Sequence, residues 1–171
     1  MNKFLCRPWG LGLLTIVLIW LDQFTKKLAV THLKDQDPFV IWDGVFELHY
    51  LENRGAAFGM LQGQRTFFLI VGVIVFALVV YLFCNMSKDA KFWPLRLIAV
   101  AVLAGAWGNM IDRMLYAYVV DFFYFKLINF PIFNVADIYV SVGTVILAVL
   151  ILFYYKDEDM DNLLVKKEKK A

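Results

Sequence analysis

Residues that bind metals or form disulfides are scarce in this sequence, which has two cysteines and two histidines among its 171 residues. Cys6 and Cys84 both fall at the cytoplasmic ends of the apolar segments described below, where disulfides rarely persist. His32 and His49 do not have the helical spacing of zinc ligands. We therefore expect no disulfide and no metal site, and we assign the cysteines no functional role.

Sequence signatures of common hydrolase classes are also missing. There is no Gly-x-Ser-x-Gly elbow, no His-Glu-x-x-His zinc motif and no Gly-x-Gly-Asp segment. No histidine–serine couple falls within the apolar segments, so an activated hydroxyl nucleophile is not indicated. The side chains that remain for chemistry are carboxylates.

Charged residues make up only 19% of the chain, whereas 61% of the residues are hydrophobic and the mean hydropathy is +0.66. This composition is too apolar for an ordinary soluble domain. A membrane span requires about 20 mostly apolar residues, and four segments meet this requirement. The predicted spans are residues 9–29, 67–84, 95–112 and 135–155. We expect an all-α membrane protein in which four transmembrane helices form one domain over residues 1–171.

The distribution of basic residues predicts which side of the membrane each connection occupies. The termini and the 85–96 connection contain ten of the 17 lysines and arginines, and the opposite side contains seven. By the positive-inside rule both termini are cytoplasmic. The first span has no small-residue cleavage site, so we interpret it as a retained signal-anchor helix. Residues 156–171 are expected to be a frayed, solvated cytoplasmic tail.

The extracytoplasmic segments, about 31–65 and 114–133, carry the β-strand pattern. Hydrophobic and polar residues alternate between residues 46 and 50, as in a half-buried strand. Short strands need more partners than one hairpin supplies, so residues 116–130 are expected to contribute. The sequence therefore predicts a small extracytoplasmic β-containing region beside the four helices.

Four aspartates are the most informative charged residues, because each lies in or beside an apolar segment. They are Asp22, Asp112, Asp121 and Asp137. An acid at the centre of a membrane helix costs roughly 2.5–3.5 kcal/mol, so its presence suggests a function. The ends of spans one and three, the start of span four and the link before it all share one side of a four-span protein. We therefore expect the four carboxylates to gather at one face of the membrane.

Helical periodicity places small and polar residues together in the last two spans. In the third span Gly105 and Gly108 share a face with Asp112, and small residues there permit close helix packing. Asn134 is a natural N-cap for the fourth span, and Asp137 is then the third helical residue, where a carboxylate suits the helix dipole. Asp137 could merely cap its helix, but the polar face that continues from it favours a second role.

Two carboxylates held a few ångströms apart cannot both ionise cheaply, so such a pair shares one proton. The ionised member can take a proton from water. The protonated member can polarise a peptide carbonyl and later donate to the leaving nitrogen. Aspartyl chemistry in a membrane is the reaction type that these residues support best.

The four acids allow six possible pairs, and their neighbours favour one of them. Asp112 precedes Arg113, which favours a structural or orienting role. Asp22 is spaced for an i,i+4 ion pair with a lysine. Asp121 and Asp137 have no obvious cation beside them. Of the four aspartates, we therefore expect these two to have the most strongly perturbed pKa values. This pattern favours Asp121 and Asp137 as the pair but leaves the others open.

Five blocks of the sequence stand out in order along the chain. They are Leu21-Asp22-Gln23-Phe24-Thr25-Lys26, Asn53-Arg54-Gly55-Ala56-Ala57-Phe58-Gly59, Gly105-Ala106-Trp107-Gly108-Asn109-Met110-Ile111-Asp112-Arg113, Val120-Asp121-Phe122 and Phe133-Asn134-Val135-Ala136-Asp137. Together these blocks resemble the lipoprotein signal peptidases, the type II signal peptidases of bacteria. The resemblance covers nearly the whole chain, with matching number and order of spans. Ala104 departs from the pattern, because family members often carry a second glycine there.

The resemblance implies an aspartic endopeptidase of the bacterial inner membrane, with its active site toward the outer face. Such enzymes cut prolipoproteins just before a cysteine that bears diacylglycerol. The catalytic dyad corresponds to Asp121 and Asp137, and Asp112 corresponds to a structural acid. Positions that shape the site or contact substrate correspond to Asp22, Lys26, Asn53, Arg54, Asn109, Arg113 and Asn134.

The resemblance implies no metal or organic cofactor. The expected partners are the lipid-modified prolipoprotein and membrane lipids, with no nucleic acid and no obligate protein partner. Two other functions stay open on the residues alone: a proton-coupled carrier, since membrane acids also relay protons, and a scaffold whose acids clamp helices together. Asn53 and Arg54 could simply close a turn, and Asn109 and Arg113 could join helices.

Overall fold

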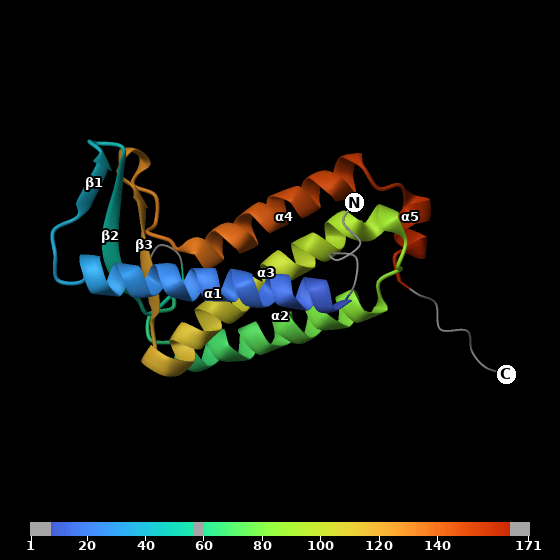
Figure 1. The fold of residues 1–171 in the computed structure, drawn as a ribbon, viewed down its shortest axis with the longest axis horizontal. Helices are drawn as coiled ribbons and strands as arrows, with labels where there is room; N and C mark the ends of the chain where they lie inside the picture. Colours follow the sequence, from blue (N-terminus) through green and yellow to red (C-terminus); the bar gives the residue numbers. More distant parts are fainter. Residues whose placement is uncertain (1–7, 57–59, 165–171) are drawn as a thin grey trace.

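The structure, a computed structural model, describes residues 8–56 and 60–164 of the chain (Figure 1). Within these residues it contains five α-helices, two short 3-10 helices and three β-strands. In chain order they are α1 (Pro8–Leu33), β1 (Phe39–Trp42), β2 (Phe46–Asn53), α2 (Arg65–Asn85), η2 (Ala90–Phe92), α3 (Trp93–Tyr116), β3 (Val119–Phe125), η3 (Lys126–Ile128), α4 (Val135–Phe153) and α5 (Asp157–Asn162).

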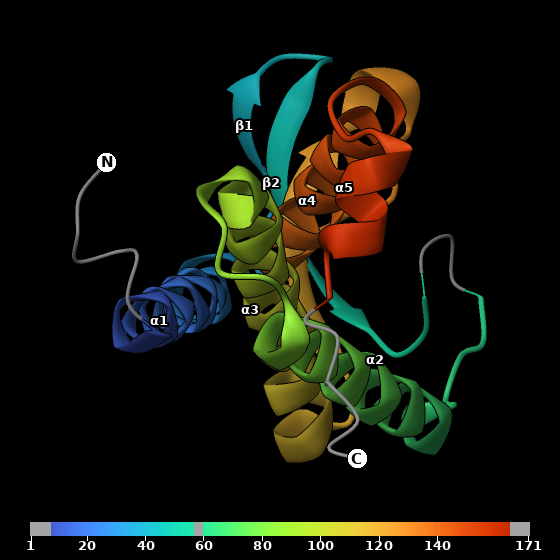
Figure 2. The same cartoon turned by 90° about the vertical axis from the view of Figure 1, so that its right-hand side faces the viewer.

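Helix α3 is the centre of the helical bundle, and α1, α2 and α4 are arranged around it (Figure 2). Among the described residues, three helical segments are long and apolar enough to cross a membrane: Arg65–Asn85, Ala90–Tyr116 and Val135–Phe153. They correspond to the second, third and fourth predicted spans. Helix α1 has 26 residues, a length of about 39 Å at 1.5 Å per residue, but Asp22, Lys26 and Lys27 interrupt its apolar run.

A three-stranded antiparallel sheet lies at one end of the bundle, in the order β1-β2-β3 (Figure 1). The predicted strand near residues 46–50 is confirmed as β2, and the predicted contribution from residues 116–130 is β3. The register between these strands shifts between Leu48 and Leu51, which places Leu51 opposite Asp121. The sheet thus holds Asp121 at the end of the bundle where α4 begins.

Close approach between helices depends on small residues in α3, as predicted. Ala104 and Ala136 are fully buried. A Cβ atom at Gly105 would lie 2.5 Å from the Ala136 oxygen, and one at Gly108 would collide with the Asp22 carboxylate. Because these two positions have no side chain, α4 and α1 can pack closely against the backbone of α3.

The prediction of a frayed tail is wrong for residues 157–164. Helix α5 folds back on the connection after α2, where the Ser87 N–H donates to the Leu163 oxygen at 2.7 Å and Lys91 pairs with Asp159 at 2.6 Å. Tyr155, just before α5, packs in a buried apolar cluster whose other members are Met86, Phe92, Leu95 and Ile98. Apolar burial orders this part of the tail despite its charge, and residues 165–171 lie outside the described chain.

Of the two cysteines, Cys84 is exposed and free, and Cys6 lies outside the described residues.

We expect Gly105→Ala to destabilise the protein, because the added methyl group meets the Ala136 backbone, which cannot move aside. Overpacking of this kind costs about 1–3 kcal/mol. Gly12→Ala is the matched control, since a Cβ atom there meets nothing within 4 Å and alanine is the better helix former by about 0.5–1 kcal/mol. Thermal unfolding of the purified variants in detergent measures both changes in stability as shifts of the unfolding midpoint. Equal midpoints for the two variants would contradict close packing at Gly105.

Candidate active site

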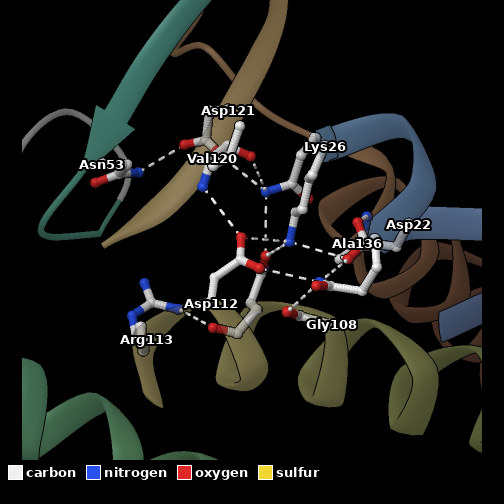
Figure 3. Close-up of polar contacts among 12 residues, drawn as sticks. Asp22, Lys26, Asn53, Gly108, Asp112, Arg113, Val120, Asp121 and Ala136 are labelled. Atoms are coloured by element: carbon white, nitrogen blue, oxygen red, sulfur yellow. Dashed lines mark hydrogen bonds and ion pairs between the residues drawn. The ribbon is translucent and has the colours of Figure 1, made fainter. Parts of the chain in front are cut away.

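The buried polar side chains of the helical bundle gather where α1, α3, β3 and α4 meet (Figure 3). The least exposed of them, at 3% or less, are Asp22, Lys26, Asp112, Asp121 and Asn134. Asp137 lies at the edge of this cluster, at the start of α4. The four aspartates, which we expected at one face of the membrane, therefore gather at one end of the bundle.

Asp121 occupies the middle of β3 and is almost completely buried. Its two carboxyl oxygens accept hydrogen bonds from neutral amides: Oδ1 from Asn134 Nδ2 at 2.6 Å and Oδ2 from Asn53 Nδ2 at 2.9 Å. Burial raises the pKa of the Asp121 carboxyl to about 7, and the charge of Asp137 adds to the rise. The two amides lower the pKa but do not offset desolvation. Asp121 is thus poised to gain or lose a proton near neutral pH.

Asp137 is part of a capping box at the start of α4, as the sequence predicts. Asn134 Oδ1 accepts from the Asp137 N–H at 3.0 Å, and Asp137 Oδ2 accepts from the Asn134 N–H at 3.1 Å. The other oxygen, Oδ1, accepts from Asn109 Nδ2 at 2.8 Å. Capping therefore uses only Oδ2 of Asp137, and Oδ1 contacts the neighbouring polar residues of the site.

Asn134 connects the two carboxyl groups of the candidate dyad. Its side-chain NH2 group donates to Asp121, while its backbone N–H donates to Asp137. The two aspartates also line the same cavity, of about 420 Å³. Its remaining walls come from Asn53, Gly55, Ala56, Arg113, the 130–133 segment and the first two turns of α4. Both carboxyl groups therefore face a space large enough for a peptide segment and water.

Behind the dyad, a buried ion network joins α1 to α3. Lys26 Nζ lies 2.9 Å from Asp22 Oδ2, 3.0 Å from Asp112 Oδ2 and 2.9 Å from Asn109 Oδ1. The predicted i,i+4 pair between Asp22 and Lys26 is thereby confirmed. Asp22 also accepts from the Ala136 N–H at 2.9 Å. The network fastens the start of α4 to the other two helices.

Asp112 contacts residues of other elements and does not pair with Arg113, its neighbour in the sequence. It binds Lys26 and accepts from the Val120 N–H at 3.1 Å. Arg113 instead donates to the Gly55 oxygen at 3.0 Å and lies over the Phe68 ring, 4.6 Å from its centre. Consecutive helical residues point about 100° apart, so Asp112 faces the ion network whereas Arg113 faces the cavity.

The two residues of the Asn53–Arg54 block separate in space. Asn53 donates to Asp121, and its oxygen accepts from the Gly55 N–H at 2.9 Å. Arg54 is exposed, pairs with Glu52 at 3.3 Å and lies over the Tyr118 ring at 5.6 Å. Asn53 therefore belongs to the site, whereas Arg54 lies outside the cavity lining.

Several residues of the site were not singled out from the sequence. Gln23 donates to Asp112 at 3.0 Å and to the Gly108 oxygen at 3.1 Å, and its place beside Asp22 in a matching block was the available signal. Ser141 and the 130–133 segment line the cavity. Ser141 shares the polar face of α4, but no periodicity marks a loop segment. Among the described residues, no group of three or more potential ligands could hold a metal ion.

This arrangement suits hydrolysis of an amide by a pair of acids. One carboxyl group is half-exposed at a helix start and the other is buried with a pKa near 7. Water can enter the cavity between them, and the ionised member of the pair can take its proton. Arg113, on the same cavity wall, supplies a positive charge for an oxygen that becomes negative.

Comparisons with known proteins agree on one family. The family model described as signal peptidase (SPase) II matches residues 14–153. A lipoprotein signal peptidase of Clostridioides difficile is 42% identical over 142 residues, which are 83% of this chain and 94% of the relative. The corresponding protein of Caldanaerobacter subterraneus is 41% identical over 137 residues, 80% of this chain and 91% of the relative.

Solved structures show the same fold. A bacterial membrane enzyme determined by the in meso method at 2.3 Å resolution superimposes with a TM-score of 0.74 and 33% identity, covering 96% of this chain and 95% of that one. A second, determined at 1.9 Å, gives a TM-score of 0.73 with 29% identity and covers 86% of this chain and 96% of that one.

The raised pKa of Asp121 predicts how stability depends on pH. The folded protein keeps a proton that the unfolded chain releases above the ordinary value of 3.8. This contribution to stability is complete below about pH 4 and is lost as the pH rises to about 7. Each pKa unit corresponds to about 1.4 kcal/mol, so the total loss is on the order of a few kcal/mol.

Thermal unfolding in detergent over this pH range measures the effect. Asp137→Asn should make the total decrease smaller and end it at a lower pH, because it removes the charge that adds to the pKa shift of Asp121. Asp37→Asn, at an exposed position outside the site, is the control and should follow the parent protein. The interpretation is wrong if Asp137→Asn and the parent lose the same total stability between about pH 4 and about pH 7.

Proposed function

The chain belongs to the signal peptidase II family, and from this premise we propose that it removes the signal peptide from diacylglyceryl-modified prolipoproteins. The cut falls just before the lipidated cysteine. The proposal is supported by the family match over residues 14–153 and by relatives named lipoprotein signal peptidase. The enzyme is an aspartic peptidase, consistent with a site whose titratable groups are mostly carboxyl groups.

We assign the catalytic dyad to Asp121 and Asp137. The observation that carries this assignment is that Asn134 donates to both carboxyl groups and that both line one cavity. The ionised member takes a proton from a water molecule, which attacks the peptide carbonyl. The protonated member polarises that carbonyl and then protonates the leaving nitrogen. The pair returns to its starting state with one proton between its two members.

The supporting residues divide by what they contact. Asn53, Asn109 and Asn134 orient the dyad, and Arg113 faces the substrate space. Asp22, Lys26 and Asp112 join the helices behind it, where Gly105 and Gly108 allow close contact. Arg54, exposed at the rim beside Glu52, is placed to meet lipid headgroups or the substrate rather than the scissile bond.

We further propose that α1 is a fourth membrane span and that residues 1–171 form one membrane-embedded peptidase domain. The sheet and the start of α4 lie at the same end of the bundle (Figure 1), so the dyad residues in β3 and in the first turn of α4 lie there too. We place this end at the outer face of the bacterial inner membrane. Both termini are then cytoplasmic, in agreement with the basic residues at the other end. The substrate's signal helix and acyl chains remain in the bilayer while the scissile bond reaches the dyad.

A carrier or a scaffold would use the same acids differently. A carrier needs a polar path that continues into the inner half of the membrane, but the acids lie at one end and α2 has no charged residue after Arg65. A scaffold needs the acids only as helix contacts. In that role a neutral isostere of either dyad member would cost stability without abolishing a chemical activity.

Asp121→Asn and Asp137→Asn should each give a folded, membrane-inserted protein that does not cleave a diacylglyceryl prolipoprotein. Loss of one proton-transfer group lowers the rate by at least about 10²-fold. Asp37→Asn, the same change at an exposed position, should cleave at the parent rate. Gel analysis of the shortened product after incubation with the purified variants gives the readout. Retained cleavage in either dyad variant would remove that residue from the dyad.

A comparison of a lipidated and an unlipidated form of the same precursor tests the function and its substrate class together. We expect the purified protein to shorten the diacylglyceryl precursor and to leave the unmodified precursor intact. Equal cleavage of both would show a peptidase without the proposed lipid requirement. Cleavage of neither, by protein that is folded in detergent, would favour the scaffold.

A further inference from the structure

The orientation of a side-chain amide is settled when one of its ends meets a group that can only donate. Asn134 Oδ1 accepts from the backbone N–H of Asp137, so its NH2 group must face Asp121. Asn53 Oδ1 accepts from the backbone N–H of Gly55, so its NH2 group also faces Asp121. Both asparagines therefore present donors to the dyad and cannot turn without losing a backbone hydrogen bond.

Asn109 is oriented in the same way, but by a charge instead of a backbone group. Its Oδ1 lies 2.9 Å from Lys26 Nζ, and an ammonium group has no acceptor. The Asn109 NH2 group must then face Asp137 Oδ1, at 2.8 Å. Lys26 is 3% exposed and has its other two contacts with Asp22 and Asp112. Asn109 Oδ1 also accepts from Asn134 Nδ2 at 3.1 Å, which favours the same orientation. The NH2 group of Asn109 thus connects the buried ammonium to Asp137.

The two dyad members differ in the kind of donor that surrounds them. Asp137 has a backbone N–H at the start of a helix, where the helix dipole favours an anion, and an amide polarised by Lys26. Asp121 is 1% exposed in a strand and has only the neutral amides of Asn53 and Asn134. The environment of Asp137 therefore suits the charged form better than that of Asp121.

We propose that Lys26 is a positioning residue of the dyad. By holding the Asn109 amide in one orientation, it keeps Asp137 as the ionised member and leaves the shared proton on Asp121. The reaction then begins in one direction: Asp137 takes a proton from water, while Asp121 donates a hydrogen bond to the carbonyl and then transfers its proton to the leaving nitrogen. The proton that Asp137 has gained returns to Asp121 before the next cycle. This inference rests on the proposed dyad and adds to it the assignment of the acid and the base.

Other charges near the dyad do not favour ionisation of one aspartate over the other. Arg113, from α3, interacts electrostatically with both Asp121 and Asp137. The acids behind the dyad, Asp22 and Asp112, are bound to Lys26, which leaves that cluster with a net charge of −1. Lys26 also acts on Asp121 through space, since its charge lowers the pKa of that carboxyl. Its hydrogen-bonded connection through the Asn109 amide, however, ends on Asp137.

The pH dependence of kcat/KM separates this role from a purely structural one. Asn109→Ala removes the amide but leaves Lys26 paired with its two carboxylates. Lys26→Met combined with Asp112→Asn removes the donor while the cluster keeps a net charge of −1. Both variants should move the acid limb of the profile to higher pH by about one unit or more, because Asp137 then competes for the shared proton. Lys27→Met, the same change at the exposed neighbouring lysine, should leave the profile in place.

An acid limb that stays at the parent pH in Asn109→Ala would overturn the proposal. The single substitution keeps the buried ion pairs, so it tests the idea even if the double variant does not fold. Binding of the lipidated precursor, measured separately by fluorescence anisotropy, should change less than kcat. If only binding changes, Lys26 and Asn109 contact substrate and do not position the dyad.

Infrared difference titration of carboxyl groups tests the location of the proton without any substrate. In the parent protein near pH 6 we expect a protonated carboxyl band that disappears in Asp121→Asn and remains in Asp137→Asn. The reverse pattern would overturn the assignment. Because this measurement does not depend on cleavage, a protein that cleaves no precursor would refute the proposed function while the band still decides which aspartate holds the proton.

Discussion

Backbone contact at the start of α4 is the constraint on which the site depends. Gly105 lets the Ala136 carbonyl approach α3, and Gly108 leaves room for the Asp22 carboxylate. Asp22 in turn accepts from the Ala136 N–H, which fastens the helix start from the side of α1. A side chain at Gly105 would push α4 away, and one at Gly108 would displace the Asp22 carboxylate that holds the helix start. In either case Asn134 and Asp137 would move. Close helix packing and the placement of the proposed catalytic groups are therefore one requirement.

The parts of this arrangement that follow from local pattern were predictable. The capping box of Asn134 and Asp137, the small-residue face of α3 and the strand β2 each depend on residues a few positions apart. Three apolar helices could likewise be located by length and composition. The gathering of the aspartates followed from the number of spans, because the ends of alternate spans share one side.

Other features depend on which elements meet, and local pattern does not contain that information. Asp112 pairs with Lys26 from another helix instead of taking Arg113, because neighbouring helical residues face different directions. The charged tail folds as α5 because Tyr155 and Leu163 have an apolar partner surface near the end of α2. Arg54 points outward although Asn53 points inward, as alternation at a strand end requires.

Asp137 has two roles that are chemically incompatible at some moment of every turnover. Its carboxylate caps α4 by accepting from the Asn134 N–H, and in the proposed reaction it also receives a proton from water. A protonated carboxyl group is a weaker acceptor and no longer benefits from the helix dipole. The first turn of α4 is then held least firmly while the cleaved products are present. The catalytic cycle would in this way loosen its own scaffold at the step when the signal peptide has to leave.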